Sequence, residues 1–296
     1  MNLTQFRHFV AVAEERHFSR AAEKLGIAQP PLSQSIARLE TALGFKLLER
    51  TRRSVALTPA GEALLRELEP ALRHLDNGLR ISRLIHEGKL QSVTVGFVAV
   101  ALTKALPAMI REIRELEPEC KIKLQMMSTL PQEQALLEGG IDIGIIFPRP
   151  DELPGIESCT IEESRPVLAI PNGWPLAQKA TVTLLDIQDQ PIFMFERERR
   201  PELHAALWAE FTRQGLRPRV ELEPPDTYTT LSLVAAGIGL AIIPAPSSGI
   251  EFAGVTFAPL QGLGEHLTLR LAMAWRAHSA PSLGDLTARL AQKFAV

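Results

Sequence analysis

One face of the segment from residue 29 to residue 43 gathers side chains that can read nucleic-acid bases. At about 100° per residue, apolar side chains form one helical stripe: Leu32, Ile36, Leu39 and Leu43. Polar or helix-opening residues occupy the remaining surface: Gln29, Pro30, Ser33, Gln34 and Arg38. Gln34 can make paired hydrogen bonds to an adenine edge, Ser33 can bond a base or a phosphate, and Arg38 can reach a phosphate or a guanine. This pattern indicates a helix for a DNA major groove, although an amphipathic helix with a solvated polar face has the same periodicity.

Basic residues follow this segment directly. Gly44 ends the predicted helix, and residues 45–57 are typical of a short hairpin with a basic tip. Arg50, Arg52 and Arg53 would neutralise backbone phosphates there, which gives salt-sensitive affinity that does not depend on base sequence. A solvated charge run is the alternative. The position directly after a candidate reading helix favours a DNA-binding wing.

A shorter helix is predicted immediately before the reading helix. Ser19 is a suitable N-cap for a helix that runs to Leu25, and Gly26 can adopt the left-handed conformation that follows it. Pro30 and Pro31 fit the first turn of the next helix, where amide donors have no intrahelical partner. The sequence therefore predicts a helix-turn-helix motif. An earlier helix would cover its inner faces with apolar side chains at helical spacing: Leu3, Phe6, Phe9, Val10 and Ala13.

From Met1 to about Gly61 the chain resembles the N-terminal domain of LysR-type transcriptional regulators. The resemblance rests on the segment FVAVAEERHFSRAAEKLGIAQPPLSQSIARLETALGFKLLERTRRSVALTPAG, which has the helix, the turn, the proline-opened helix, the basic wing and the LTPAG exit in family order. The segments AQPPLSQSI and LVAAGIGLAIIPA are most similar to the regulators of aromatic-compound catabolism. The resemblance implies a winged helix-turn-helix domain over residues 1–58 that binds double-stranded promoter DNA. It also implies a contact with RNA polymerase if the protein is an activator.

Residues 59–88 are predicted to form one long helix. Thr58 is a cap and Pro59 a first helical residue, and a stripe of leucines follows: Leu64, Leu68, Leu72, Leu75 and Leu79. At ~1.5 Å per residue the rod is about 40 Å long, and on a separate strut its leucines would be covered by a second copy of the chain. An intrachain core helix is the alternative. The resemblance implies the paired helix, with two reading helices on two half-sites of an imperfect palindrome and a dimer or tetramer as the assembly.

From residue 89 onward, helical and strand patterns alternate, so the fold class is α/β behind an all-α N-terminal winged helix-turn-helix. The resemblance implies a two-lobed effector domain over residues 89–296 that is similar to periplasmic solute-binding proteins. Lobe I would contain residues 89–161 and 267–296, and lobe II residues 162–266.

A small effector, an organic or aromatic acid, is expected at the carboxyl ends of the strands, between the lobes. The residues expected there follow predicted strands or open helices: Ala99, Val100, Ser128, Thr129, Phe147, Arg149, Phe195 and Thr227. Residues 99–101 would present free backbone amides to the acid, and Arg149 would pair with its carboxylate. Val100 departs from the Ser that relatives binding muconate-like acids often carry, whereas Thr129 matches them. Thr129 as a helix cap, Phe195 in the core and a solvated Arg149 are the structural alternatives.

Composition limits the other functions. The net charge is −2, but residues 1–58 hold nine Lys and Arg against five Asp and Glu, so only this part has the sign for nucleic acid. No apolar run reaches the ~20 residues of a membrane span and the N-terminus lacks a signal peptide, so a cytoplasmic protein is expected. The histidines and cysteines have no metal-ligand spacing, and no enzymatic motif or cofactor motif occurs. A thiol redox sensor using Cys120 and Cys159, and a solute-binding protein or enzyme with a vestigial winged domain, are the alternative functions.

Overall fold

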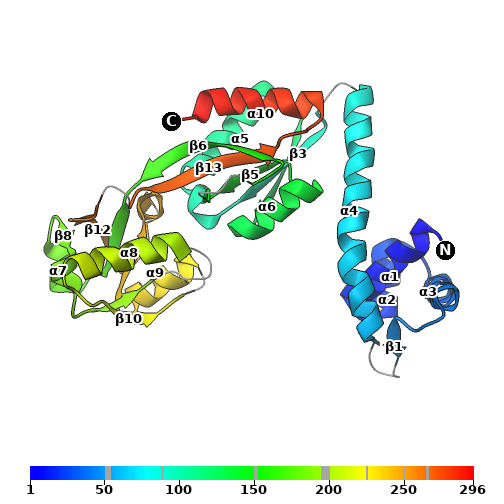
Figure 1. The fold of residues 1–296 in the computed structure, drawn as a ribbon, viewed down its shortest axis with the longest axis horizontal. Helices are drawn as coiled ribbons and strands as arrows, with labels where there is room; N and C mark the ends of the chain where they lie inside the picture. Colours follow the sequence, from blue (N-terminus) through cyan, green and yellow to red (C-terminus); the bar gives the residue numbers. More distant parts are fainter. Residues whose placement is uncertain are drawn as a thin grey trace. The chain divides into compact units, whose positions relative to one another are not determined.

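The computed structural model describes residues 1–50, 55–87, 90–149, 153–194, 201–224, 226–249, 251–264 and 267–296. The chain divides into two compact units, Met1–Arg83 and Leu84–Val296. The first unit contains helices and one small hairpin, and the second contains two β-sheets with helices against them (Figure 1). The α/β fold behind an N-terminal helix-turn-helix is therefore as predicted.

The first unit has four helices and two strands in its described part. They are α1 (Leu3–Glu15), α2 (Phe18–Leu25), α3 (Gln29–Leu43), β1 (Leu48–Arg50), β2 (Val55–Leu57) and α4 (Pro59–Glu87). Gly26 ends α2 at φ 67° and Gly44 ends α3 at φ 81°, in the left-handed region where glycine avoids the strain of a Cβ. The N-cap predicted for α2 is wrong. His17 caps this helix, because its Nδ1 accepts the Ser19 amide at 3.2 Å and Ser19 already lies in the first turn.

The core of the first unit is formed by the inner faces of α1, α2 and α3. Fully buried side chains meet there: Phe9, Val12, Ala21, Leu32, Ile36, Leu39 and Leu47. Phe6 and Val10 pack against this cluster as half-buried residues. Leu3 was expected in the core but is 43 % exposed, because it is the first residue of α1 and does not join the cluster.

Helix α4 has the predicted length, although Pro70 lies inside it. Its leucine stripe divides into two parts. Leu64 and Leu68 pack against the core of the first unit, and Leu72 is 9 % exposed. Leu75 and Leu79 are 39 % and 50 % exposed. The first leucines of the stripe are thus covered by the core of their own unit, because α4 packs against it. Periodicity alone did not predict this intrachain contact.

The second unit begins with a five-stranded sheet of order β4-β3-β5-β13-β6. Its strands are β3 (Ser92–Phe97), β4 (Lys121–Met126), β5 (Ile143–Ile146), β6 (Ile156–Ser164) and β13 (Leu269–Arg276). Strands β4, β3 and β5 are parallel, and β13 is antiparallel to β5 and β6. The helical segments are η1 (Ala99–Leu102), α5 (Ala105–Leu116), α6 (Thr129–Glu138) and α10 (Pro281–Phe294). Figure 1 shows α10 along one face of the sheet and α6 on the other.

The second sheet has six strands in the order β10-β9-β11-β7-β12-β8. They are β7 (Pro166–Pro171), β8 (Val182–Thr183), β9 (Pro191–Phe193), β10 (Arg219–Leu222), β11 (Leu240–Pro244) and β12 (Val255–Gln261). The accompanying helical segments are η2 (Pro175–Gln178), α7 (Leu184–Ile187), α8 (Pro201–Arg213), α9 (Thr227–Ala235) and η3 (Ala245–Gly249). Their apolar side chains form two clusters, one around Leu207, Phe211 and Ile242 and the other around Phe193, Leu231 and Val234.

The sequence prediction lacked three strands of the second unit: β6, β8 and β12. Strand β6 reads IESCTIEES and is only partly buried, so it lacks both the apolar run and the clear alternation that mark a strand. It pairs with β13 up to Ser164, so the five-stranded sheet extends three residues past the expected end of lobe I at residue 161. The chain passes to the second sheet at Arg165.

No helix in the described part of the chain is both long enough and apolar enough to cross a membrane.

Candidate nucleic-acid interface and effector site

Helix α3 presents the residues that the sequence selected for reading DNA. Gln29, Pro30, Gln34 and Arg38 are exposed, and Ser33 is half-buried. Both prolines lie in the first turn, as expected, and no side chain caps the helix. Gln29 is not isolated, because its Oε1 accepts a hydrogen bond from the Ser19 hydroxyl at 3.0 Å. This bond joins the first turns of α2 and α3, so both helices present their N-terminal ends together.

The orientation of α3 is set by its opposite face. Leu32, Ile36 and Leu39 are each 0 % exposed, so the helix cannot rotate without exposing them. A polar contact adds to this packing: His8 Nδ1 lies 2.8 Å from Ser35 Oγ, between α1 and α3. Burial lowers the pKa of His8, which favours the neutral ring at this contact. The side of α3 that carries Gln34 and Arg38 therefore points away from the core.

The predicted wing is present as an antiparallel hairpin. Strands β1 and β2 pair Leu48 with Leu57 and Arg50 with Val55. Arg50 thus ends the first strand, next to the connection. Arg52 and Arg53 lie outside the described residues.

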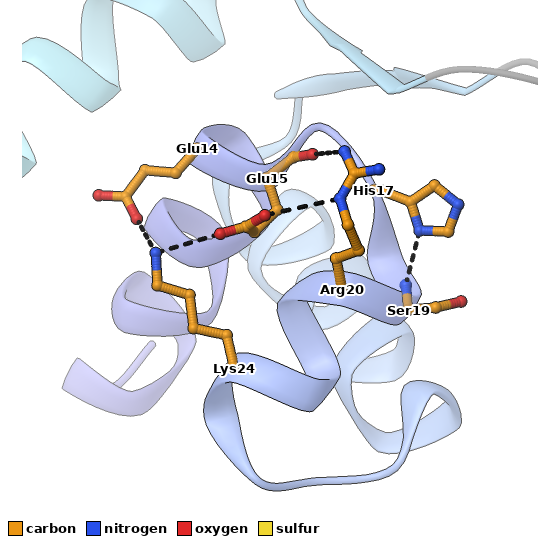
Figure 2. A network of polar contacts seen from close by, with 6 residues as sticks. All are labelled: Glu14, Glu15, His17, Ser19, Arg20 and Lys24. Atoms are coloured by element: carbon orange, nitrogen blue, oxygen red, sulfur yellow. Dashed lines mark hydrogen bonds and ion pairs between the residues drawn. The ribbon is translucent and has the colours of Figure 1, made fainter.

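Several cations of the first unit that contributed to its basic balance are neutralised within the chain. Figure 2 shows Lys24 on α2 reaching two carboxylates of α1, at 2.9 Å from Glu14 and 3.2 Å from Glu15. Arg20 has its Nε 3.6 Å from the Glu15 carboxylate, and it also donates to the Glu15 carbonyl oxygen at 2.5 Å (Figure 2). Arg7 is paired with Asp76 of α4. Lys24, Arg20 and Arg7 are therefore each paired with a carboxylate of the same unit.

At the carboxyl end of β3, in the five-stranded sheet, the chain continues into η1. Val100 is 5 % and Ala101 0 % exposed. The expectation of a free amide at Ala101 is wrong, because this amide donates to the Val98 carbonyl at 2.9 Å and closes the 3₁₀ turn. Ala99 is half-buried at the start of η1.

Thr129 and Phe147 are brought together, although they lie 18 residues apart. The Thr129 hydroxyl accepts the Phe147 amide at 3.2 Å, so the start of α6 is tied to the residue after β5. Ser128 is the N-cap of α6 and is exposed, with no capping bond from its side chain. These three residues therefore lie together at the carboxyl ends of β4 and β5.

Arg149 has a partner that the sequence did not suggest. Its Nε lies 3.4 Å from Oε1 of Glu133, whose side chain is 9 % exposed. Burial raises the pKa of Glu133, and the charge of Arg149 opposes this effect. Glu133 lies one helical turn after Thr129 and therefore on the same face of α6. This i to i+4 spacing is the sequence signal that could have identified Glu133 as a residue near the site. The Arg149 side chain itself is 45 % exposed.

The second sheet contributes the start of α9. Thr227 is half-buried and follows the N-cap Asp226, whose carboxylate accepts the Thr229 amide at 2.9 Å. Phe195 lies outside the described residues. The two sheets approach through η1 and η3, where a Cβ on Gly249 would lie 3.7 Å from the Cβ of Thr103. Sequence reasoning did not select η3, because its five residues carry no charged or aromatic side chain.

The two cysteines cannot meet in this fold. Cys120 directly precedes β4 and Cys159 lies on β6, and these strands are the opposite edges of the five-stranded sheet. Four strand spacings correspond to about 19 Å, far beyond the ~6 Å of a disulfide. Burial raises the pKa of Cys120 to about 11 and also raises that of Cys159, so both thiols are poorly ionised. The geometry opposes a redox pair.

No group of three or more metal-binding side chains occurs among the residues that the structure describes.

A winged helix-turn-helix joined by one long helix to a two-sheet α/β domain defines a DNA-binding transcriptional regulator with an effector-binding domain. Two family models match this chain. Residues 3–62 match the bacterial regulatory helix-turn-helix protein, lysR family, and residues 86–294 match the LysR substrate binding domain. The chain belongs to the LysR family of transcriptional regulators, which confirms the resemblance seen in its sequence.

Individual relatives agree with this assignment over most of their length. The HTH-type transcriptional regulator AlsR of Bacillus subtilis (strain 168) is 37 % identical over 87 % of this chain and 85 % of its own. The HTH-type transcriptional regulator BenM of Acinetobacter baylyi is 34 % identical over 88 % of this chain and 86 % of its own. The crystal structure of CbnR, a LysR family transcriptional regulator, superposes with a TM-score of 0.81 at 26 % identity and full coverage of both chains. The crystal structure of full-length CbnR complexed with its target DNA superposes with a TM-score of 0.80.

Proposed function

We propose that this regulator reads a palindromic promoter site with α3 and holds the flanking phosphates with its wing. The main support for this proposal is the surface of α3. Gln34 and Arg38 are exposed there, opposite the fully buried stripe of Leu32, Ile36 and Leu39. A glutamine and an arginine on a helix that cannot rotate can distinguish adenine and guanine edges. Arg50, Arg52 and Arg53 supply affinity that does not depend on base sequence.

The assembly that fits a palindrome is a dimer through α4. Leu75 and Leu79 support this proposal, because they remain 39 % and 50 % exposed on a helix whose earlier leucines are covered. Replacing both with Lys should place like charges in the helix pair and yield monomers in analytical ultracentrifugation. Leu185→Lys is the matched control, since Leu185 is also exposed, at 61 %, but belongs to lobe II. A double variant that remains dimeric would contradict this assignment of α4.

An acidic effector is the ligand that best suits the end of the first sheet. Arg149 offers a cation there, Thr129 and Ser128 offer hydroxyls, and Phe147 offers an apolar surface. Binding between the lobes would favour one lobe arrangement and alter the spacing of the DNA readers. A coupling free energy of roughly 1–3 kcal/mol between the two sites would suffice.

A thermal-shift screen of small carboxylic acids tests the effector proposal. An acid that stabilises the protein should also change promoter binding measured by fluorescence anisotropy, on DNA from the region upstream of the gene. Arg149→Ala should abolish the thermal shift. Arg111→Ala is the matched control, because Arg111 is an exposed arginine of α5 away from the strand ends. An acid that stabilises wild type and Arg149→Ala equally would contradict the assigned role of Arg149.

A further inference from the structure

The recognition helix carries a buried carboxylate that base reading does not use. Glu40 lies near the end of α3, between the buried Leu39 and the half-buried Leu43, and is 2 % exposed. Removing a carboxylate from water is costly unless several hydrogen bonds compensate it. A residue of this kind at this position therefore needs strong partners.

Three partners of Glu40 belong to the first residues of the wing, Lys46, Leu47 and Leu48. Its Oε1 accepts the backbone amides of Leu47 at 3.0 Å and Leu48 at 3.2 Å. Its Oε2 lies 2.8 Å from the Nζ of Lys46. Burial alone would raise the pKa of Glu40, but the bonds from Lys46, Leu47 and Leu48 outweigh burial and lower it. The carboxylate is thus charged and directed at the backbone where β1 begins.

The same backbone is held from its other side by the start of α4. The Thr58 hydroxyl donates to the Lys46 carbonyl at 2.8 Å, and the Thr58 amide donates to the Leu47 carbonyl at 3.0 Å. The approach is close, because a Cβ on Gly61 would lie 2.1 Å from that Leu47 oxygen. Residues 46–48 are therefore clamped between α3 and α4.

We infer that Glu40 is a positioning residue for DNA binding: it fixes the direction in which the wing leaves the recognition helix. Its side chain is only 2 % exposed, so it acts through the amides of Leu47 and Leu48 and not by a contact of its own with DNA. Arg50, Arg52 and Arg53 follow Leu48 by two to five residues in the sequence, so a change of direction at Leu48 would move the arginines that the proposal assigns to phosphates. This inference rests on the proposed role of the wing in binding phosphates.

The two functions of the carboxylate can be separated by two conservative substitutions. Glu40→Gln keeps an oxygen at full reach for the two amides and loses the charge opposite Lys46. Glu40→Asp keeps the charge and withdraws the oxygen by one methylene. Positioning through the amides predicts that Glu40→Gln behaves as wild type and that Glu40→Asp is defective. A role for the charge alone predicts the reverse.

The readout is the salt dependence of binding to a fluorescein-labelled DNA duplex of arbitrary sequence, measured by anisotropy with the full chain. The double substitution Arg52→Ala/Arg53→Ala should reduce the slope of log K against log [salt] by about 2, since each phosphate contact contributes ~0.9. Glu40→Asp should reduce the slope similarly. Adding the arginine substitutions to Glu40→Asp should then produce little further loss, because the wing contacts are already absent.

The outcomes distinguish this inference from the wing proposal itself. A slope unchanged by the arginine substitutions would overturn both. A slope reduced by them but unchanged in Glu40→Asp, or losses that add in the combined variant, would overturn only the role of Glu40.

Hydrogen exchange by mass spectrometry on the full chain controls for folding. Glu40→Asp should lose protection in residues 45–50 and keep it in α1. If this variant unfolds, α1 exchanges as well, and Glu40→Gln alone decides. If Glu40→Gln keeps the salt slope of wild type and keeps residues 45–50 protected, positioning by hydrogen bonds is supported. A reduced salt slope in Glu40→Gln overturns it.

Discussion

Replacing Gly61 with alanine should destabilise the first unit, although alanine favours helices. The new Cβ would lie 2.1 Å from the Leu47 carbonyl oxygen and 3.1 Å from Leu57 Cδ2. Because the oxygen belongs to the backbone, α4 and the wing base must separate, and overpacking of this kind typically costs ~1–3 kcal/mol. The displaced oxygen also weakens its bond from the Thr58 amide, worth ~1 kcal/mol. Helix propensity returns ~1 kcal/mol, so a net loss of about 2 kcal/mol in unfolding free energy is expected.

Gly78→Ala provides the matched control, on the same helix. Nothing lies within 4 Å of a Cβ on Gly78, so this variant should gain ~0.5–1 kcal/mol from helix propensity alone. Urea unfolding followed by far-UV circular dichroism measures both variants. With a slope of about 2 kcal/mol per molar urea, Gly61→Ala should lower the midpoint by about 1 M. All three tryptophans lie in the second unit, so their fluorescence monitors that unit separately. Equal midpoint shifts for the two variants would refute the close-approach argument.

Three further results are expected. Gln34→Ala should lose ~1–3 kcal/mol of discrimination at a single base position in a panel of operator variants, and a uniform loss over all sequences would contradict direct reading. Asp186→Asn should cost ~0.5–1 kcal/mol at pH 7, because the half-exposed Lys179 and the Thr183 cap hold the Asp186 pKa at about 2. This contribution is present above the unfolded pKa near 4 and is lost as pH falls through about 2, so urea midpoints of the two proteins should converge there. Cys120→Ser/Cys159→Ser should bind promoter DNA as wild type does, with or without reductant, and a reductant effect confined to wild type would restore the redox hypothesis.

Local residue chemistry predicted helices α2 and α3 of the first unit well. Gly26 and Gly44 end helices through their own backbone freedom, and Pro30 and Pro31 open one through their missing amides. The stripe of Leu32, Ile36 and Leu39 follows from helical geometry alone. Such signals lie within a few residues of the structure they specify, so they can be read without knowing the rest of the chain.

Pairings across the chain were not predictable in this way. The leucine stripe of α4 has the same periodicity whether it packs against the core of its own first unit or against a second copy of the chain. The fold places Leu64 and Leu68 against the core of the first unit. Arg149 could serve an effector from any exposed position, yet its Nε is held by Glu133. Strand β6 acquires its conformation from β13, more than 100 residues later, rather than from its own pattern.

The sequence by itself determined that α2 and α3 form, that they end at Gly26 and Gly44, and which side of α3 is outward, because these properties depend on neighbours along the chain. Only the tertiary structure decided what Glu40 does. In the sequence it is one more charged residue on a helix, and in the fold its carboxylate is buried against the amides of Leu47 and Leu48. A hydrogen bond requires an acceptor to lie within about 3 Å of a donor in the right direction. Periodicity cannot supply that condition, because it depends on how the chain turns between the two groups.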